Sequence, residues 1–204
     1  MTPAAGTIAE AKRRLRQEMR EVRAALAPDE KAGAERLACE SLLRDVDLEA
    51  DAAVAGYWPL AAEFDLRPAL LALAARGHPI GLPVVRGRGQ PLQFRRWTPG
   101  IALEPAAFGV SVPPPQAPEL EPAVVLAPLL AFDAQGYRLG YGGGYYDLTL
   151  AALRRRTPAV RVGALAFARQ ERASLPHDGF DQRLDWVVTE AGVRCLAAAR
   201  ESAS

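Results

Sequence analysis

Apolar residues follow helical spacing in the first fifty positions and form short unbroken runs after them. Over residues 34–42 the apolar positions recur at steps of three and four, which predicts a half-buried helix beginning at Pro28. Thr7 and Glu10 have the spacing of a capping box, in which a hydroxyl and a carboxylate satisfy the free N–H groups of a first turn. We therefore expect an earlier helix from Thr7 to about Leu26.

From residue 52 onward, short apolar runs bounded by glycine, proline or charged residues indicate buried strands. These runs are 53–58, 80–85, 123–127, 160–167 and 186–189. Helical spacing lies between or after them, at 65–76, about 144–156 and about 190–200. A further run, 92–97, is suited to pair with 80–85. This alternation predicts an α/β fold, with a mostly parallel sheet and helices on both faces, that is, an open α/β sandwich.

One interval interrupts this alternation. Residues 98–122 contain seven prolines, which predicts a stiff extended connection with at most one short turn of structure. We interpret it as a loop that follows the surface rather than as a linker between domains. The expected organisation is therefore one α/β domain over residues 1–204, with a proline-rich loop at about 98–122.

Composition excludes several classes of protein. The 25 Lys and Arg residues against 24 Asp and Glu leave a net charge of +1, so no overall charge attracts nucleic acid or a membrane surface. Cys39 and Cys195 lack the spacing of a disulfide framework or a zinc site. We expect neither a secretory leader nor a membrane span, because residues 1–6 lack a basic region followed by an apolar run and no uncharged apolar stretch of about 18 residues occurs. We expect a cytoplasmic protein.

The densest chemical signal is a glycine-rich segment, 136–147, that follows a predicted strand and opens a predicted helix. Glycines let backbone N–H groups approach an anion, and the following helix N-terminus adds partial positive charge. The spacing matches neither a P-loop nor a dinucleotide fingerprint. A tight turn without function remains the alternative, although Arg138 and Asp147 at the flanks favour a phosphate site.

Carboxylates beside a phosphate cradle would repel the ligand unless a divalent cation lay between them, so Asp147 favours Mg²⁺. Asp181 and Asp185, before the last strand, are further candidates, with solvated loop residues as the alternative. Four basic residues of the first helix share one face: Lys12, Arg16, Arg20 and Arg23. This face either meets polyphosphate or is simply solvated, and spacing alone favours the second.

A third candidate group follows the strand at 53–58. Asp65 is placed to cap the next helix, whereas Glu63 is less easily explained by capping. With the nearby aromatic residues, Glu63 is suited to a slot for a flat ring. Those aromatic residues are Tyr57, Trp58, Phe94 and Trp97, for which burial in the core is the alternative. His78 and His177 are isolated, so covalent catalysis is not indicated.

Taken together, these motifs resemble the 5-formyltetrahydrofolate cyclo-ligases, also called 5,10-methenyltetrahydrofolate synthetases, over nearly the whole chain. The most specific element is the run from Arg138 to Asp147, with its Gly-Gly-Gly-Tyr-Tyr-Asp core. Weaker elements occur in the expected order: 12–16, Tyr57-Trp58-Pro59 with Glu63 and Asp65, Pro128, Phe132-Asp133, Val162-Gly163, Phe167, Gln170, Leu175-Pro176, Asp181, Asp185 and 187–189.

The resemblance implies an enzyme that uses ATP to cyclise 5-formyltetrahydrofolate to 5,10-methenyltetrahydrofolate, releasing ADP and phosphate. It implies that Asp147 and Asp181 hold Mg²⁺, and that Lys12, Arg138 and Asp147 are catalytic. The implied nucleotide-binding residues are Lys12, Arg16, Arg138, Leu139, Gly140, Tyr141, Gly142, Gly143, Gly144, Tyr145 and Tyr146. The implied folate-binding residues are Trp58, Glu63 and Tyr145. A monomer without nucleic-acid or membrane partners is expected.

The chain departs from the family pattern at three positions. Some members carry Arg and Lys in the glycine loop where this chain has Tyr141 and Gly143, and Leu148 replaces an Arg that often follows the aspartate. We expect altered nucleotide affinity rather than loss of the reaction. Two alternatives remain: a non-catalytic nucleotide- or RNA-binding module, and a related α/β enzyme that does not use ATP, such as a sugar-phosphate isomerase or CoA transferase.

Overall fold

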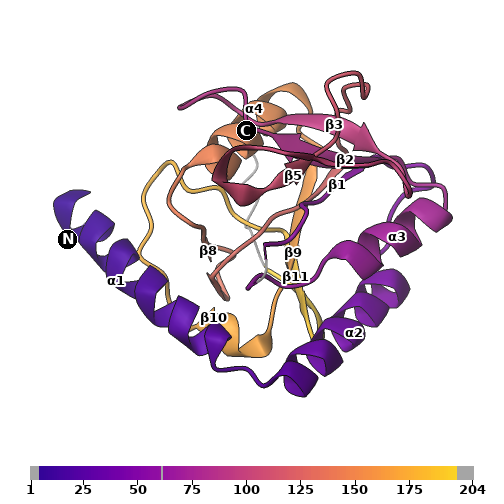
Figure 1. Ribbon diagram of the computed structural model, residues 1–204. Coiled ribbons are helices and arrows are strands. Elements are labelled where there is room, and N and C mark those ends of the chain that lie inside the picture. Colours follow the sequence, from indigo (N-terminus) through magenta and orange to yellow (C-terminus); the bar gives the residue numbers. More distant parts are fainter. Residues whose placement is uncertain (1–4, 61, 197–204) are drawn as a thin grey trace.

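The computed structural model describes residues 5–60 and 62–196. Within these residues a central sheet has seven strands in the order β12-β11-β9-β6-β1-β2-β3 (Figure 1). The strands are β1 Val54–Ala55, β2 Ile80–Val84, β3 Gln93–Trp97, β6 Val124–Leu126, β9 Arg161–Leu165, β11 Trp186–Thr189 and β12 Gly192–Cys195. The helices are α1 Ala5–Ala24, α2 Pro28–Asp45, α3 Arg67–Ala75 and α4 Tyr145–Arg156.

The inner part of the sheet is parallel and its two edges are antiparallel. β11, β9, β6, β1 and β2 pair in parallel, whereas β12 pairs antiparallel with β11 and β3 pairs antiparallel with β2. The predicted pairing of the 92–97 run with the 80–85 run is thereby confirmed. The predicted mostly parallel α/β sheet is also confirmed.

Both faces of the sheet are covered, because alternate residues of each strand point to opposite sides. On β6, Val124 and Leu126 belong to the hydrophobic core formed with α2 and α3, while Val125 belongs to the core formed with Leu150 and Leu153 of α4. Figure 1 shows α2 and α3 together on one side of the sheet and α4 on the other. The predicted two-sided sandwich is confirmed.

The first helix packs against a second, smaller sheet rather than against the central one. That sheet has the order β10-β7-β8, with β7 Ala131–Asp133, β8 Arg138–Leu139 and β10 Glu171–Arg172, and a short 3₁₀ helix, η2 Ala168–Gln170, precedes β10. Leu15, Met19 and Val22, at helical steps of four and three, join its core beside Leu139. The capping-box prediction was wrong, because Thr7 lies within α1 and not before its first turn.

The prediction of a C-terminal helix at about 190–200 was also wrong over residues 190–196, which the structure describes. Residues 192–195 form β12, which turns back along β11. Gly192 has a φ of 111°, and the Thr189 hydroxyl accepts a hydrogen bond from the Ala191 N–H, so a tight turn replaces a helix start here. Residues 197–200 of that prediction lie outside the described residues.

The proline-rich segment is extended, as predicted, but it also contains a small hairpin. β4 Glu104–Pro105 and β5 Ser111–Val112 pair antiparallel around a 3₁₀ turn, η1 Ala107–Gly109. Phe108 stands in this turn with a φ of 64° and is 70% exposed. Further along, the Leu120 N–H donates to Phe94 O, which ties the segment to β3.

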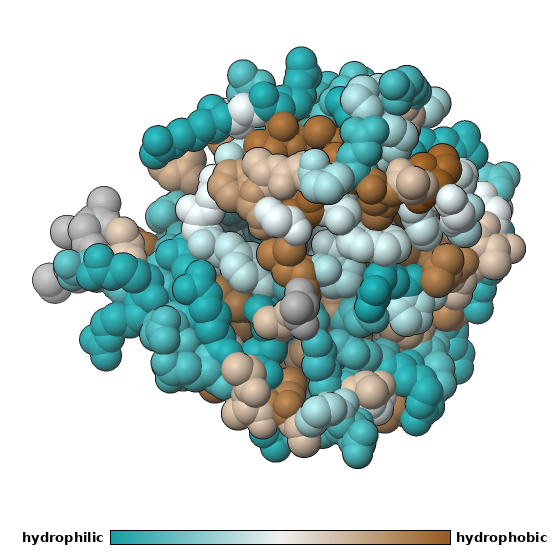
Figure 2. Space-filling view, in the orientation of Figure 1, coloured by the Kyte–Doolittle hydropathy of each residue, from teal (hydrophilic) through white to brown (hydrophobic). Residues whose placement is uncertain are grey.

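Surface polarity differs between the parts of the molecule. In Figure 2 the surface where Figure 1 labels α1 is mostly hydrophilic, whereas hydrophobic residues gather around α4 and β5. Among the described residues, none of the helices combines the length and the apolar character needed to cross a membrane.

The close packing of β9 against β11 leads to a first prediction. A Cβ at Gly163 would lie 2.2 Å from ring atoms of Trp186, whose side chain is itself buried. Gly163→Ala is therefore expected to lower the free energy of unfolding by about 2–3 kcal/mol, measured by urea denaturation. Gly33→Ala is the matched control, because a Cβ in that part of α2 meets nothing within 4 Å and should raise stability by about 0.5–1 kcal/mol. Equal stability of the Gly163→Ala and wild-type proteins would contradict this packing.

Candidate active site

A pocket of about 870 Å³ opens at the carboxyl ends of the central strands. Tyr57 and Trp58, which follow β1, and Pro128, which follows β6, form part of its wall. β1 leads to β2 on one side of the sheet order, whereas its neighbour β6 leads to β9 on the other. Ligands of open parallel sheets bind in the crevice where the strand order reverses in this way. The topology therefore indicates this pocket as the candidate active site.

The glycine-rich run forms a loop between β8 and the first turn of α4. Gly142 and Gly144 have φ angles of 103° and 69°, a conformation that favours glycine. A Cβ at Gly142 would also lie 3.2 Å from the guanidinium carbon of Arg16. The loop ends at the N-terminus of α4, where N–H groups without helical partners attract anions. The local geometry is therefore that of an anion cradle.

Basic residues of α1 extend into this pocket. Lys12 Nζ donates to Asp181 Oδ2 at 2.6 Å, and Arg16 Nε donates to Gly140 O at 2.8 Å. Burial and then the charge of Arg20 lower the pKa of the Arg16 guanidinium. Arg20 itself is exposed. The interpretation of this face as merely solvated was therefore wrong for Lys12 and Arg16, because helical spacing shows which residues share a face but not what the face contacts.

A buried arginine supports the first turn of α4. The Arg138 side chain is 3% exposed, and its Nη2 donates to Asp147 Oδ1 at 2.8 Å. The same oxygen accepts a 3.0 Å hydrogen bond from the Gln182 N–H, and Arg138 Nη1 donates to Gln182 O. Arg138 thus joins the α4 carboxylate to the loop that carries Asp181.

Asp147 and Asp181 both line the pocket and offer a donor set for a divalent cation. The bonded oxygens are Asp147 Oδ1 and Asp181 Oδ2, which leaves one oxygen of each carboxylate without a hydrogen bond from the described residues. Within residues 5–60 and 62–196 there is no group of three or more His, Cys, Asp or Glu side chains able to hold a metal ion. Mg²⁺ is commonly held by one or two carboxylates together with substrate phosphates. The residues present fit Mg²⁺ bound in that way.

Next to the glycine loop, Glu63 is buried among phenol groups. It is 7% exposed, and its Oε2 accepts a 2.8 Å hydrogen bond from the Leu60 N–H. Burial first, and the charge of Glu63 second, raise the pKa values of Tyr57, Tyr141 and Tyr146, so these phenols stay protonated. The Tyr146 hydroxyl is buried and has no partner among the described residues. This part of the pocket therefore combines one charged acceptor, a free hydroxyl and aromatic rings.

All the site residues that the family resemblance implies line this one pocket. They are Lys12, Arg16, Trp58, Glu63, Arg138, Leu139, Gly140, Tyr141, Gly142, Gly143, Gly144, Tyr145, Tyr146, Asp147 and Asp181. Phe94 and Trp97, proposed with Tyr57 and Trp58 for a ring slot, do not line it, because they are 4% and 3% exposed in the two cores. Asp185 does not line it either.

Several lining residues were not predicted. Asp178 and Gln182 stand beside Asp181 on the same loop, so the presence of Asp181 was the available signal. Phe108 and Phe180, 70% and 86% exposed, line the pocket from the proline-rich hairpin and from that loop. No pattern in the sequence marks either of them.

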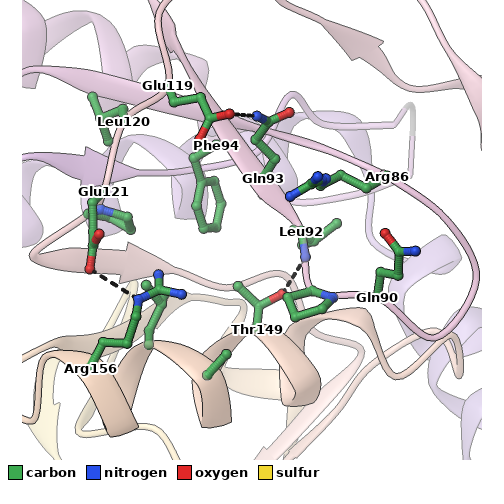
Figure 3. A pocket seen from close by; sticks show the side chains of 14 residues that line it. Arg86, Gln90, Leu92, Gln93, Phe94, Glu119, Leu120, Glu121, Thr149 and Arg156 are labelled. Atoms are coloured by element: carbon green, nitrogen blue, oxygen red, sulfur yellow. Dashed lines mark hydrogen bonds and ion pairs between the residues drawn. The ribbon is translucent and has the colours of Figure 1, made fainter.

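A second pocket, of about 560 Å³, lies behind the site between β3 and α4 (Figure 3). There the Leu92 N–H donates a 2.8 Å hydrogen bond to the Thr149 hydroxyl, and the Leu92 side chain lines both pockets. Thr149 stands only two residues after Asp147. This contact therefore fixes the first turns of α4, and with them the carboxylate of the candidate site.

Comparison with known proteins gives consistent matches. A family model described as the 5-formyltetrahydrofolate cyclo-ligase family matches residues 8–190. A relative named 5-formyltetrahydrofolate cyclo-ligase in Haemophilus influenzae is 27% identical over 175 residues, covering 83% of this chain and 92% of the relative. One of the same name in Mycolicibacterium smegmatis is 39% identical over 141 residues, covering 61% and 68%.

Solved structures agree with these matches. The 5,10-methenyltetrahydrofolate synthetase of Aquifex aeolicus superposes with a TM-score of 0.76 at 30% identity, covering 93% of this chain and 94% of that one. That of Mycoplasma pneumoniae superposes with a TM-score of 0.69 at 22% identity, covering 88% and 98%, which supports the fold alone.

Proposed function

The chain belongs to the 5-formyltetrahydrofolate cyclo-ligase family, and from this premise we propose that the pocket of about 870 Å³ is where it closes the folate ring at the expense of ATP. One observation carries the assignment to this pocket. Residues between Lys12 and Asp181, which the family resemblance marks as functional, come from α1, the β1 end, the glycine loop, α4 and the 178–182 loop and meet around one cavity.

The reaction needs no nucleophilic side chain. The formyl oxygen of 5-formyltetrahydrofolate attacks the γ-phosphorus of ATP, the bond to ADP breaks, and N10 then attacks the activated formyl carbon and expels phosphate. Cys39 does not take part, because it lies in the α2 core, where burial raises the pKa of its thiol to about 12. The protein must instead align a weak nucleophile with phosphorus and neutralise the phosphoryl charge.

We assign the phosphate side to the glycine loop and its neighbouring cations. N–H groups of 140–144 and of the first turn of α4 bind phosphate oxygens, while Lys12, Arg16 and Arg138 supply positive charge. Asp147 and Asp181 would hold Mg²⁺, which supplies charge neutralisation at the phosphates when bound. Lys12 also forms an ion pair with Asp181.

We assign the folate side to the part of the pocket around Glu63. Glu63 is a charged hydrogen-bond acceptor for the N–H groups of a pterin ring, and the Tyr146 hydroxyl is available for a further hydrogen bond. Trp58 and Tyr145 supply flat apolar surface. A monomeric state and a cytoplasmic location stay predictions.

Replacing Lys12 tests whether α1 serves the phosphate side or the folate side of the pocket. Lys12→Ala is expected to raise the KM for ATP roughly tenfold, because one charge-assisted contact to phosphate is lost, with little change in the KM for folate. Steady-state kinetics with each substrate varied in turn provide the measurement. Arg13→Ala is the matched control, since Arg13 is exposed on the same helix. A change confined to the folate KM would show that α1 serves the other substrate.

The function as a whole is tested by measuring ADP release with and without 5-formyltetrahydrofolate. We expect ADP to form only when the folate is present, in proportion to the folate consumed. ADP release of equal rate without folate would indicate an ATPase, and binding of RNA that weakens steeply with salt would support a nucleic-acid module instead.

A further inference from the structure

Arg23, near the end of α1, is a buried cation that the reaction described above does not use. It is 7% exposed, and its Nη1 donates a 2.9 Å hydrogen bond to the Tyr141 hydroxyl. Its guanidinium carbon lies 5.7 Å from the centre of the Tyr141 ring. Its Nε is buried without a partner among the described residues. A guanidinium buried in this way requires compensation that one phenol oxygen does not supply.

A charge of opposite sign, that of Glu63, acts on the same phenol. The negative charge of Glu63 raises the pKa of the Tyr141 hydroxyl, whereas the positive charge of Arg23 lowers it, so both charges lie near this phenol. In the described part of the chain Glu63 has no ion pair within 4.0 Å. Tyr141 therefore accepts a hydrogen bond from the cation and lies near the carboxylate, and it stands between two buried charges that form no ion pair with each other.

The same helix fixes the neighbouring loop residue. Arg16 precedes Arg23 by two helical turns, and its Nε donates a 2.8 Å hydrogen bond to Gly140 O. Side chains of α1 therefore bind two consecutive residues of the glycine loop, Gly140 and Tyr141. Met19, between the two arginines, is fully buried in the α1 core. The burial of Met19 therefore fixes α1 in the region from which Arg16 and Arg23 contact the glycine loop.

We propose that Arg23 is a positioning residue that holds Tyr141 of the glycine loop against Glu63 and so fixes the folate acceptor to the nucleotide loop. The proposal rests on the proposed function, because it assigns Glu63 to folate and the loop to ATP. Without Arg23, Tyr141 loses its donor and Glu63 loses the buried cation that offsets its charge.

Binding measurements on a double-mutant cycle test this. Arg23→Gln and Tyr141→Phe are each expected to weaken 5-formyltetrahydrofolate binding roughly tenfold in calorimetric titrations, and the double variant no more than either alone, because both remove the same Arg23–Tyr141 contact. Arg23→Lys, which keeps the charge, should restore part of the affinity. Arg14→Gln, on the exposed face of α1, is the matched control. Wild-type affinity in Arg23→Gln, or losses that add in the double variant, would overturn the proposal.

Hydrogen exchange over 138–146 provides a readout that needs no ligand. We expect roughly tenfold faster exchange of the 140–144 amides in Arg23→Gln than in Arg14→Gln. If the wild-type protein bound no 5-formyltetrahydrofolate, the proposed function would fail, and the exchange rates would still decide the role of Arg23. Unchanged exchange would show that Arg23 does not hold the loop. A lower melting temperature with unchanged exchange and affinity would identify a purely structural residue.

Discussion

Replacing Asp147 with asparagine is expected to lower kcat at least roughly 100-fold, because the variant loses the charge that would bind Mg²⁺ at the phosphates. Asparagine keeps the shape of the side chain and can still accept the hydrogen bond that the Gln182 N–H gives to Asp147 Oδ1. Because the variant also loses the charge that pairs with Arg138, its kcat is calculated from the concentration of folded protein, which circular dichroism measures. The measurement is turnover over a magnesium titration, in which the variant should need more Mg²⁺ to reach its reduced maximum.

Asp45→Asn is the matched control for this experiment. Asp45 is a partly exposed carboxylate paired with Arg44 at the end of α2, away from the pocket. Its replacement should leave kcat unchanged. Near wild-type turnover of Asp147→Asn at every magnesium concentration would remove Asp147 from the metal site.

The second large effect is expected at Arg138. Arg138→Met removes a guanidinium that is 3% exposed, and it leaves Asp147 without its cation and Gln182 O without its donor. Breaking a buried ion pair by removing one partner typically costs about 3–5 kcal/mol. Because Asp147 is itself 30% exposed, we expect the free energy of unfolding to fall by about 3 kcal/mol, the lower end of that range. Urea denaturation measures this, and ATP binding by the folded fraction should also weaken.

Arg156→Met provides the comparison on the same helix as Asp147. Arg156 is 61% exposed, and its pair with Glu121, 56% exposed, lies in solvent. Such pairs contribute at most about 1 kcal/mol, so this variant should change stability little. A similar small change in both variants would show that the Arg138–Asp147 pair does not hold the loop and helix together.

The sequence predicted the glycine loop well because its signal is local. Gly142 and Gly144 stand directly before α4, and both the positive φ angles and the helix N-terminus follow from neighbours in the chain. The strands of the central sheet other than β12 were also predicted, although β1 is limited to Val54–Ala55, because unbroken apolar runs reflect burial on both faces. A short run of apolar residues is therefore enough to indicate a buried strand.

Features that depend on distant residues could not be predicted in this way. Arg23 was one of the basic residues predicted to share a face of the first helix. Only the folded structure shows that it contacts Tyr141, more than a hundred positions away. Phe108 reaches the pocket only because the proline-rich segment folds into a hairpin. β12 was mistaken for a helix because a turn at Gly192 and an edge of β11 decided its conformation over local propensity.

The most direct test of the account is to mix the purified protein with 5-formyltetrahydrofolate, Mg²⁺ and ATP and to follow the near-ultraviolet absorbance of the methenyl product. ATP is omitted in one control, and Asp147→Asn replaces the wild-type protein in another. We predict a rise that requires ATP and that nearly disappears in the variant. No rise with folded wild-type protein, or an equal rise without ATP, would contradict the claim that this pocket couples ATP to closure of the folate ring.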